Sequence, residues 1–182
     1  RLQVLSSFNN VSGTMVVDED EILEKEIVSG IAYSPNEAKI TVSGVSDKPG
    51  IAARIFGPLA DSDVNVDMIV QNISVDKKTT DLTFTVTRNQ LNQAINVLEK
   101  NKNALGYEKI LSNDQVVKVS VIGVGMRSHP GVAQKMFSTL GEKGINIHVI
   151  STSEIKVSVL IDEEYTELAV RSLHSVYGLD DN

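Results

Sequence analysis

The chain has 182 residues, with 24 acidic and 17 basic side chains, a net charge of −7 and an isoelectric point of about 5.0. This acidic balance disfavours nucleic acid as a partner, because phosphate recognition needs a basic surface. No apolar run approaches the roughly 20 residues of a membrane helix, and the absence of cysteine excludes disulfides and thiolate chemistry and fits the cytoplasm.

The start of the chain carries no targeting signal that we can identify. No signal-peptide pattern opens it, and it begins at Arg1 instead of methionine. We therefore expect a part of a longer protein, or a separately processed product.

A segment near residue 50 reappears near residue 131. Residues 47–56 and 64–69 match residues 128–137 and 145–150, with Pro, Gly, Ala, Phe, Asn and Ile in register. A repeat of this length indicates a duplicated structural unit, so a site in one copy has a counterpart in the other. At this chain length the repeat predicts two small domains.

Apolar periodicity gives each copy the same order of elements, strand-helix-strand-strand-helix. In the first copy, residues 38–45, 64–70 and 82–86 alternate or run apolar as strands do. Residues 51–62 and 90–100 carry apolar side chains at helical spacing. The second copy predicts strands over 116–124, 145–151 and 155–161 and helices over 132–143 and 165–176.

A further strand precedes each copy, over residues 28–33 and 107–111. Polar segments at 34–37 and 112–115 follow these strands, and their turn chemistry predicts hairpins. Each copy then has four antiparallel strands and two helices, an α+β, ferredoxin-like arrangement with helices on one sheet face. We expect apolar positions on the other face to be buried by a partner, which predicts self-association. The positions expected on that face include Val42 and Val121.

Signals for catalysis are weak. Gly123 and Gly125 suggest a dinucleotide-binding loop, but Ser128 replaces its third glycine. No phosphate-binding loop of the ATPase type is present. The histidines lack metal-ligand spacing, so we expect no catalytic site, no metal and no cofactor.

Two loops could bind an anion. Pro49-Gly50 and Pro130-Gly131 each open a predicted helix, where free N–H groups favour a carboxylate. The next strand of each copy begins with an asparagine, Asn65 or Asn146. An ordinary tight turn explains the same residues, and duplication fits both interpretations.

Several motifs in order resemble the regulatory region of aspartate kinase, which consists of two ACT domains that bind end-product amino acids. The resemblance covers roughly residues 25–178, and residues 2–9 resemble the junction where the kinase domain ends. The motifs that carry it are residues 45–50, 68–74, 79–85, 123–131 and 146–159.

The resemblance implies an organisation and a function. It divides the chain into a segment related to the kinase domain (1–26), a first ACT domain (27–104), a second ACT domain (105–178) and a tail (179–182). Threonine, lysine or both would bind at ACT interfaces in a homodimer and inhibit an aspartate kinase catalytic domain or subunit in the cytoplasm. This gives feedback control of the pathway to lysine, threonine and methionine. Two alternatives stay open: a free-standing ACT regulator of another protein, and an oligomerisation module without a ligand.

The resemblance also implies the residues that contact the effector. In the first copy these are a loop and one strand residue: Asp47, Lys48, Pro49, Gly50, Ile51, Ala52 and Gln71. The second copy is expected to supply Asn146 and Ile147 to the same effector. A further set resembles the segments that hold lysine in lysine-sensitive members: Ser128, Gly131, Val132, Thr152, Ser153 and Glu154. The two ACT interfaces need not bind the same amino acid.

Overall fold

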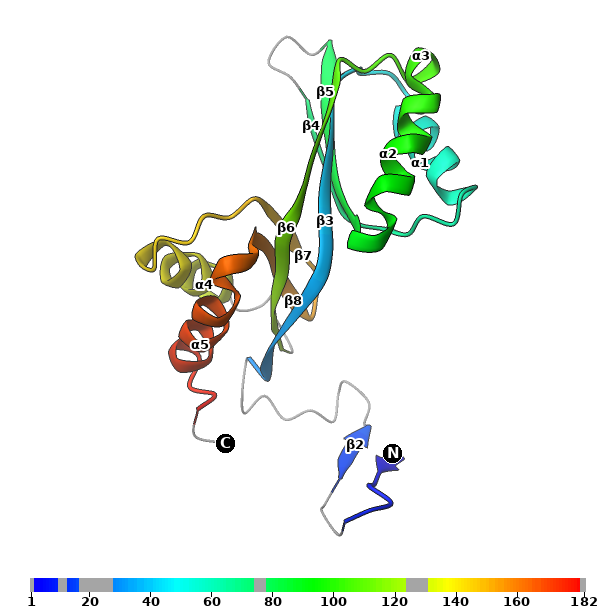
Figure 1. The fold of residues 1–182 in the computed structure, drawn as a ribbon. Helices are drawn as coiled ribbons and strands as arrows, with labels where there is room; N and C mark the ends of the chain where they lie inside the picture. Colours follow the sequence, from blue (N-terminus) through cyan, green and yellow to red (C-terminus); the bar gives the residue numbers. More distant parts are fainter. Residues whose placement is uncertain (1, 10–12, 17–27, 74–77, 124–130, 181–182) are drawn as a thin grey trace.

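The computed structural model describes residues 2–9, 13–16, 28–73, 78–123 and 131–180, and Figure 1 shows their arrangement. The strands are β1 (Leu2–Val4), β2 (Thr14–Val16), β3 (Gly30–Ser46), β4 (Val66–Ile73), β5 (Thr79–Thr87), β6 (Lys109–Ile122), β7 (Val149–Thr152) and β8 (Lys156–Asp162). The α-helices are α1 (Ile51–Ala60), α2 (Leu91–Lys100), α3 (Lys102–Leu105), α4 (Gly131–Glu142) and α5 (Thr166–Val176). Short 3-10 helices, η2 (Arg88–Gln90) and η3 (Glu163–Tyr165), precede α2 and α5. The predicted α+β class is confirmed.

One antiparallel sheet holds both repeats together. Its six strands follow the order β4-β5-β3-β6-β8-β7, and every neighbouring pair is antiparallel. The two central strands are the longest, and they pair with each other from Gly30–Ile122 to Ser43–Lys109. Both repeats therefore share the central ladder of a single sheet.

The predicted hairpins before each copy are wrong. Residues 28–33 do not fold back on the first copy, because β3 continues through 34–37 with only a local shift of register between Ser34 and Glu37. In the same way, β6 continues through 112–115. β3 and β6 pair with each other before and after both segments, and this long ladder satisfies more backbone N–H and C=O groups than two short hairpins would. The start of β3 thus lies with the second repeat, and the start of β6 lies with the first.

The two repeats have separate cores on opposite sides of the sheet. Figure 1 shows α1 to α3 on one side of the central strands and α4 and α5 on the other. The first core lies under α1 and α2 and includes Tyr107, whereas the second lies under α4 and α5 and includes Val28. Val28 lies just before β3 and Tyr107 just before β6, so each core is completed by the segment that precedes the other copy. None of the described helices is long and apolar enough to cross a membrane.

The expected exposure of Val42 and Val121 is also wrong. Both side chains are fully buried, Val42 in the first core and Val121 in the second. They point toward the helices of their repeats because the apolar set of each strand packs under the helices. These two residues therefore give no argument for self-association.

The repeats also meet through a small third cluster. Met68 of β4 packs with Val116, Val149 and Leu160, which belong to the second half of the sheet. Met68 has φ 46, and the register of β4 shifts between Asp67 and Val70. A bulge re-aims a side chain, and here the shifted segment contains the Met68 side chain that reaches the neighbouring repeat.

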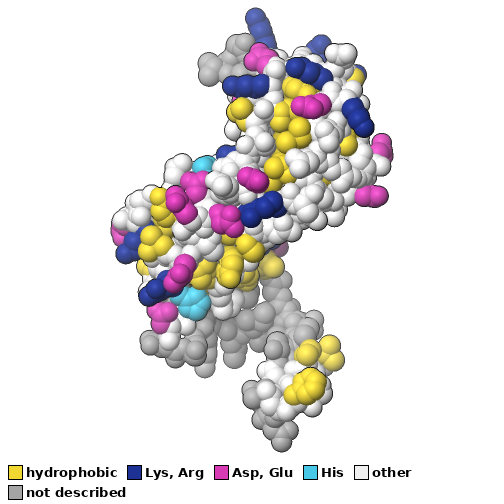
Figure 2. Space-filling model, viewed as in Figure 1, with side chains coloured by type: hydrophobic (Ala, Val, Ile, Leu, Met, Phe, Trp, Pro, Cys, Tyr) yellow, Lys and Arg dark blue, Asp and Glu magenta, His cyan; other side chains and the backbone are white. Residues whose placement is uncertain are grey.

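The N-terminal hairpin stands apart from the main sheet in Figure 1. Among the described residues, its strands β1 and β2 pair only with each other. Figure 2 shows apolar side chains on its surface, and those of Leu2, Leu5 and Phe8 are 62%, 59% and 97% exposed. On the main body, acidic and basic side chains intermingle over the face seen in Figure 2.

Candidate functional site

All seven residues expected from the first copy line one hollow. Its volume is about 400 Å³, and its walls come from the loop before α1, the first turn of α1 and one residue of β4. The lining residues are Asp47, Lys48, Pro49, Gly50, Ile51, Ala52 and Gln71. Residues 47–52, at the start of α1, and position 71, in the strand that follows α1, are thus brought together.

The loop geometry leaves amide groups facing outward at the start of α1. Gly50 adopts φ 87, a left-handed conformation that glycine accepts without strain. The amide of Ile51 donates to the carbonyl of Lys48 at 3.1 Å, so this N–H is used by the turn itself. The next amides, of Ala52 and Ala53, have no acceptor one turn earlier in the helix, and no side chain of the described residues caps α1. These two amides are the donors available to an anion.

Asp47 provides the negative charge in the same hollow. Its backbone N–H donates to the carbonyl of Lys78 at 2.9 Å, which ties the loop to the residue just before β5. Its side chain is half-buried, and that of Gln71 is exposed. The hollow therefore combines an anion-binding helix end, a carboxylate and an amide side chain.

Asn146 and Ile147 do not line this hollow within one chain. Ile147 lies in a different cavity of about 310 Å³, between β4 and the segment that leads into β7, together with Asn72 and Thr83. Asn146 is exposed. The segment is held in place by His148, whose backbone N–H donates to the carbonyl of Leu160 and whose Nε2 lies 2.8 Å from Asp162 Oδ1.

The second-copy set is only partly described. Ser128 lies outside the described residues. Gly131 begins α4 and is exposed, whereas Val132 is buried in the second core. The remaining members are exposed around the turn between β7 and β8: Thr152, Ser153 and Glu154.

Tyr177 is a contact of the second copy that sequence reasoning missed. Its hydroxyl donates to the carbonyl of Val132 at 2.7 Å, and the Lys135 ammonium lies 5.2 Å from the centre of its ring. Burial raises the pKa of Tyr177 to about 12. The side chain ties the end of α5 to the first turn of α4. An aromatic residue just after a predicted helix was the available signal.

A second missed feature is an ion cluster between the repeats. The Lys118 ammonium of β6 lies 2.7 Å from Glu37 Oε1 and 2.8 Å from Asp67 Oδ2. Burial lowers the pKa of Lys118, but the hydrogen bonds to Asp67 and Glu37 outweigh burial and leave it above its ordinary value. The hydrogen bond from Lys118 holds the pKa of Asp67 below its usual range.

Comparison with known proteins identifies the repeats. A family model described as ACT domain matches residues 39–101 and again residues 119–177. The chain belongs to the ACT domain family. The predicted tandem of two ferredoxin-like ACT domains is thereby confirmed, and each match contains most of the residues of one of the two cores.

Relatives of known identity narrow the type of ACT protein. The chain is 51% identical over 180 residues to the aspartate kinase of Pseudomonas putida, which covers 98% of the chain and 44% of that protein. It is 48% identical over 187 residues to the aspartokinase of Helicobacter pylori, covering 99% of the chain and 45% of that protein. The chain therefore spans less than half the length of these curated relatives.

Two solved structures match this chain over almost their own whole length. The structure described as aspartokinase alpha and beta subunits shares 53% identity, with a TM-score of 0.78, over 83% of this chain and 99% of that one. The ligand-free regulatory subunit of aspartate kinase from Thermus thermophilus shares 37% identity, with a TM-score of 0.78, over 83% and 99%. The ACT pair is of the type found in the regulatory part of aspartate kinase, and aspartate kinase is the enzyme to which such regulatory parts belong.

Proposed function

We propose that this chain is the effector-sensing region of an aspartate kinase that transfers phosphate from ATP to aspartate. Threonine, lysine or both bind at ACT interfaces and inhibit the kinase, which gives feedback control of lysine, threonine and methionine synthesis in the cytoplasm. The observation that supports this most directly is the single hollow lined by the whole first-copy set.

The hollow supplies a partner for each group of threonine. The amides of Ala52 and Ala53 lie at the positive end of the α1 dipole and receive the carboxylate. The Asp47 carboxylate lies within the same lining and receives the ammonium. Gln71 and the small Ala52 side chain leave a compact space with one polar side for the hydroxyl and methyl groups.

A second copy of the chain completes this site. Asn146 and Ile147 lie away from the hollow in one chain, so a partner subunit supplies them across a homodimer interface. The edge strands carry apolar side chains suited to such an interface, because Ile69, Ile73 and Ile150 are 51%, 61% and 44% exposed. β4 and β7 are the two edges of the six-stranded sheet.

The second-copy set forms the lysine-sensitive counterpart. Gly131 and Val132 open α4 as Gly50 and Ile51 open α1. Ser128, Thr152, Ser153 and Glu154 add the polar groups, of which Glu154 is suited to the side-chain ammonium of lysine. Along the sequence, the proposed division of the chain is at residues 26/27, 104/105 and 178/179, with the start of the strand that opens each ACT segment paired within the other unit.

Inhibition requires that the effector bind one arrangement of the ACT pair better than another. Equal affinity for both arrangements would leave the kinase unaffected. A coupling free energy of about 1–3 kcal/mol is the usual range for such a response.

Calorimetry of the purified chain against the standard amino acids and diaminopimelate tests the proposal. We expect heats of binding for threonine, lysine or both, and none for the others. A chain that binds no amino acid but forms dimers would instead be an oligomerisation module. If threonine or lysine binds but leaves phosphorylation unchanged in the longer protein that joins this region to a kinase domain, the chain regulates another partner.

A further inference from the structure

The two ACT units are joined at the point where β3 passes from one to the other. Up to Ser34, β3 pairs with the part of β6 that belongs to the second repeat, and from Glu37 onward it also pairs with β5 of the first. The register of β3 is irregular between these two residues. A bulge bends a strand and increases its twist. This segment is therefore the natural hinge between the units.

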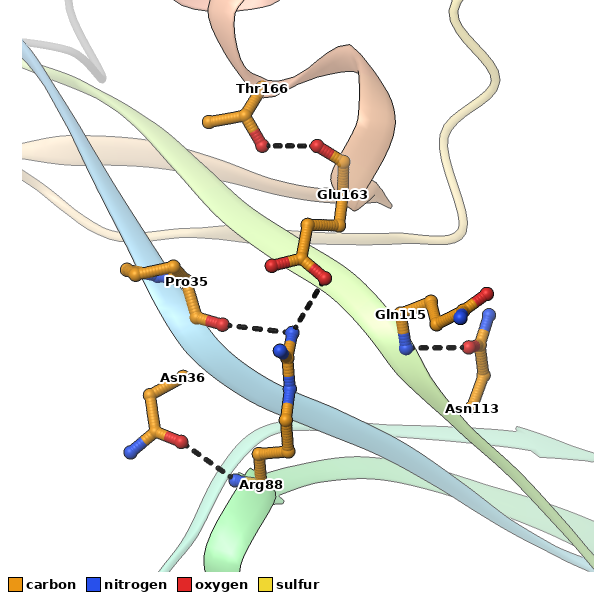
Figure 3. A network of polar contacts seen from close by, with 7 residues as sticks. All are labelled: Pro35, Asn36, Arg88, Asn113, Gln115, Glu163 and Thr166. Carbon is orange, nitrogen blue, oxygen red and sulfur yellow. Dashed lines mark hydrogen bonds and ion pairs between the residues drawn. The ribbon is translucent and has the colours of Figure 1, made fainter.

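Arg88 of the first repeat contacts both sides of this hinge (Figure 3). Its backbone N–H donates to Asn36 Oδ1 at 3.2 Å. Its guanidinium donates through one nitrogen, Nη2, to the carbonyl of Pro35 at 3.0 Å and to Glu163 Oε2 at 3.0 Å. Figure 3 shows the Arg88 side chain extended from η2 past β3 toward η3. One residue thus bonds the bulge and the other repeat together.

Arg88 and Glu163 occupy equivalent places in the two repeats. Each is the first residue of the 3-10 helix that follows the last strand of its repeat, η2 after β5 and η3 after β8. The carbonyl of Glu163 accepts a hydrogen bond from Thr166 Oγ1 at 2.6 Å, which anchors η3 to the start of α5. The ion pair therefore connects the start of one helical layer to the start of the other.

We infer that Arg88 is a positioning residue that fixes the angle between the two ACT units, with the β3 bulge as the hinge. An arginine suits this role because the two N–H groups of Nη2 lie in the fixed plane of the guanidinium and reach the two acceptors together, whereas a lysine ammonium rotates freely on a flexible stem. Resting on the proposed function, the same angle sets how the first-copy hollow meets Asn146 and Ile147 of a partner, and so sets effector affinity.

The contribution of Arg88 to folding is small. The side chains of Arg88 and Glu163 are 36% and 40% exposed, and solvent screens an ion pair of this kind. Arg88 Nε is buried and finds no acceptor among the described residues. The orientation of the units, more than thermal stability, is therefore the quantity that Arg88 controls.

The distance between the two helical layers tests this role without any effector. The chain contains no cysteine, so Asn96→Cys on α2 and Gln134→Cys on α4, both exposed, accept one spin label each. Labelled chain is diluted with unlabelled chain so that distances within one chain dominate. We expect one narrow distance distribution, a shifted or broader one in Arg88→Gln, and an intermediate one in Arg88→Lys.

Arg171→Gln is the matched control. Arg171 pairs with Glu167 at 3.3 Å inside α5, and both side chains are largely exposed, so this ion pair joins nothing across the hinge. Its distance distribution should equal that of the unsubstituted chain. If Arg88→Gln also leaves the distribution unchanged, the positioning role of Arg88 is overturned.

Threonine and lysine titrations of the same variants test the link to the effector. Substitutions that alter coupling between sites change affinity by about 2- to 30-fold, and we expect a change in this range for Arg88→Gln and none for Arg171→Gln. An unchanged affinity overturns the link between angle and effector. If the unsubstituted chain binds neither amino acid, the proposed function fails, while the distance measurement still decides the role of Arg88.

Discussion

Replacement of Lys118 by methionine should destabilise the chain strongly. The Lys118 ammonium lies 2.7 Å from Glu37 Oε1, and the two side chains are only 18% and 8% exposed. It also lies 2.8 Å from Asp67 Oδ2, whose side chain is 61% exposed. Methionine keeps much of the side-chain volume and removes the charge, which leaves the Glu37 carboxylate buried without a partner.

The expected cost follows from that unpaired carboxylate. Breaking a buried ion pair by removing one partner costs about 3–5 kcal/mol, a large share of the roughly 5–15 kcal/mol that stabilises a domain. The double variant Lys118→Met/Glu37→Gln removes both charges and should recover most of this loss. Asp67→Asn should cost no more than about 1 kcal/mol, because an exposed pair contributes little.

Urea unfolding monitored by circular dichroism measures these differences. Equal slopes of the unfolding transitions among the variants would show that the midpoints report stability. The reasoning is refuted if Lys118→Met costs less than Asp67→Asn, or if the double variant is as unstable as Lys118→Met.

Three further predictions follow from the same contacts. The pKa of Asp67 is lowered from 3.8, so the stability that its ionised carboxylate contributes is present above that pH and is lost as the pH falls below it. The free energy of unfolding, measured by urea unfolding at several pH values, should therefore fall less steeply toward acid pH in Asp67→Asn than in the unsubstituted chain. The pKa of Tyr177 is raised to about 12, so the stability that its neutral hydroxyl contributes is present below about pH 10 and is lost as the pH rises toward 12. Tyr177→Phe should remove the step at the highest pH from the ultraviolet titration of the tyrosines. Fragments 28–104 and 105–180 should each be unfolded alone and should fold when mixed, because each core includes residues from the other fragment. Circular dichroism of the separate and mixed fragments measures this, and a fragment that folds alone would contradict the exchange of strands.

Local signals in the sequence were sufficient for the repeated unit. Helical spacing predicted a helix over 51–62, and α1 spans Ile51–Ala60. The repeat predicted a matching helix over 132–143, and α4 spans Gly131–Glu142. Proline followed by glycine predicted the turn before α1, where Gly50 has a positive φ. Each of these features depends on residues within a turn or two of chain.

Features that depend on distant pairing were not predictable in this way. Polar residues at 34–37 fit a turn or a bulge equally well, and the neighbouring strand decides between them. The face of Val42 was misassigned because alternation gives two faces without saying which one the helices cover. The ion pairs of Arg88 with Glu163 and of Lys118 with Asp67 join residues far apart in sequence, and no periodicity reports them.

The central claim, an amino-acid site in the hollow before α1, is tested most directly by threonine calorimetry on Ala52→Thr and Ala53→Thr. Both positions lie in the first turn of α1, but only Ala52 lines the hollow. The Ala53 side chain is exposed, and threonine at position 53 keeps the backbone amide that the site uses. Extra atoms in a filled space cost about 1–3 kcal/mol, so Ala52→Thr should weaken threonine binding by about 5- to 160-fold. Ala53→Thr should bind within about twofold of the unsubstituted chain, as surface substitutions usually do. Unchanged threonine affinity in Ala52→Thr would contradict the site.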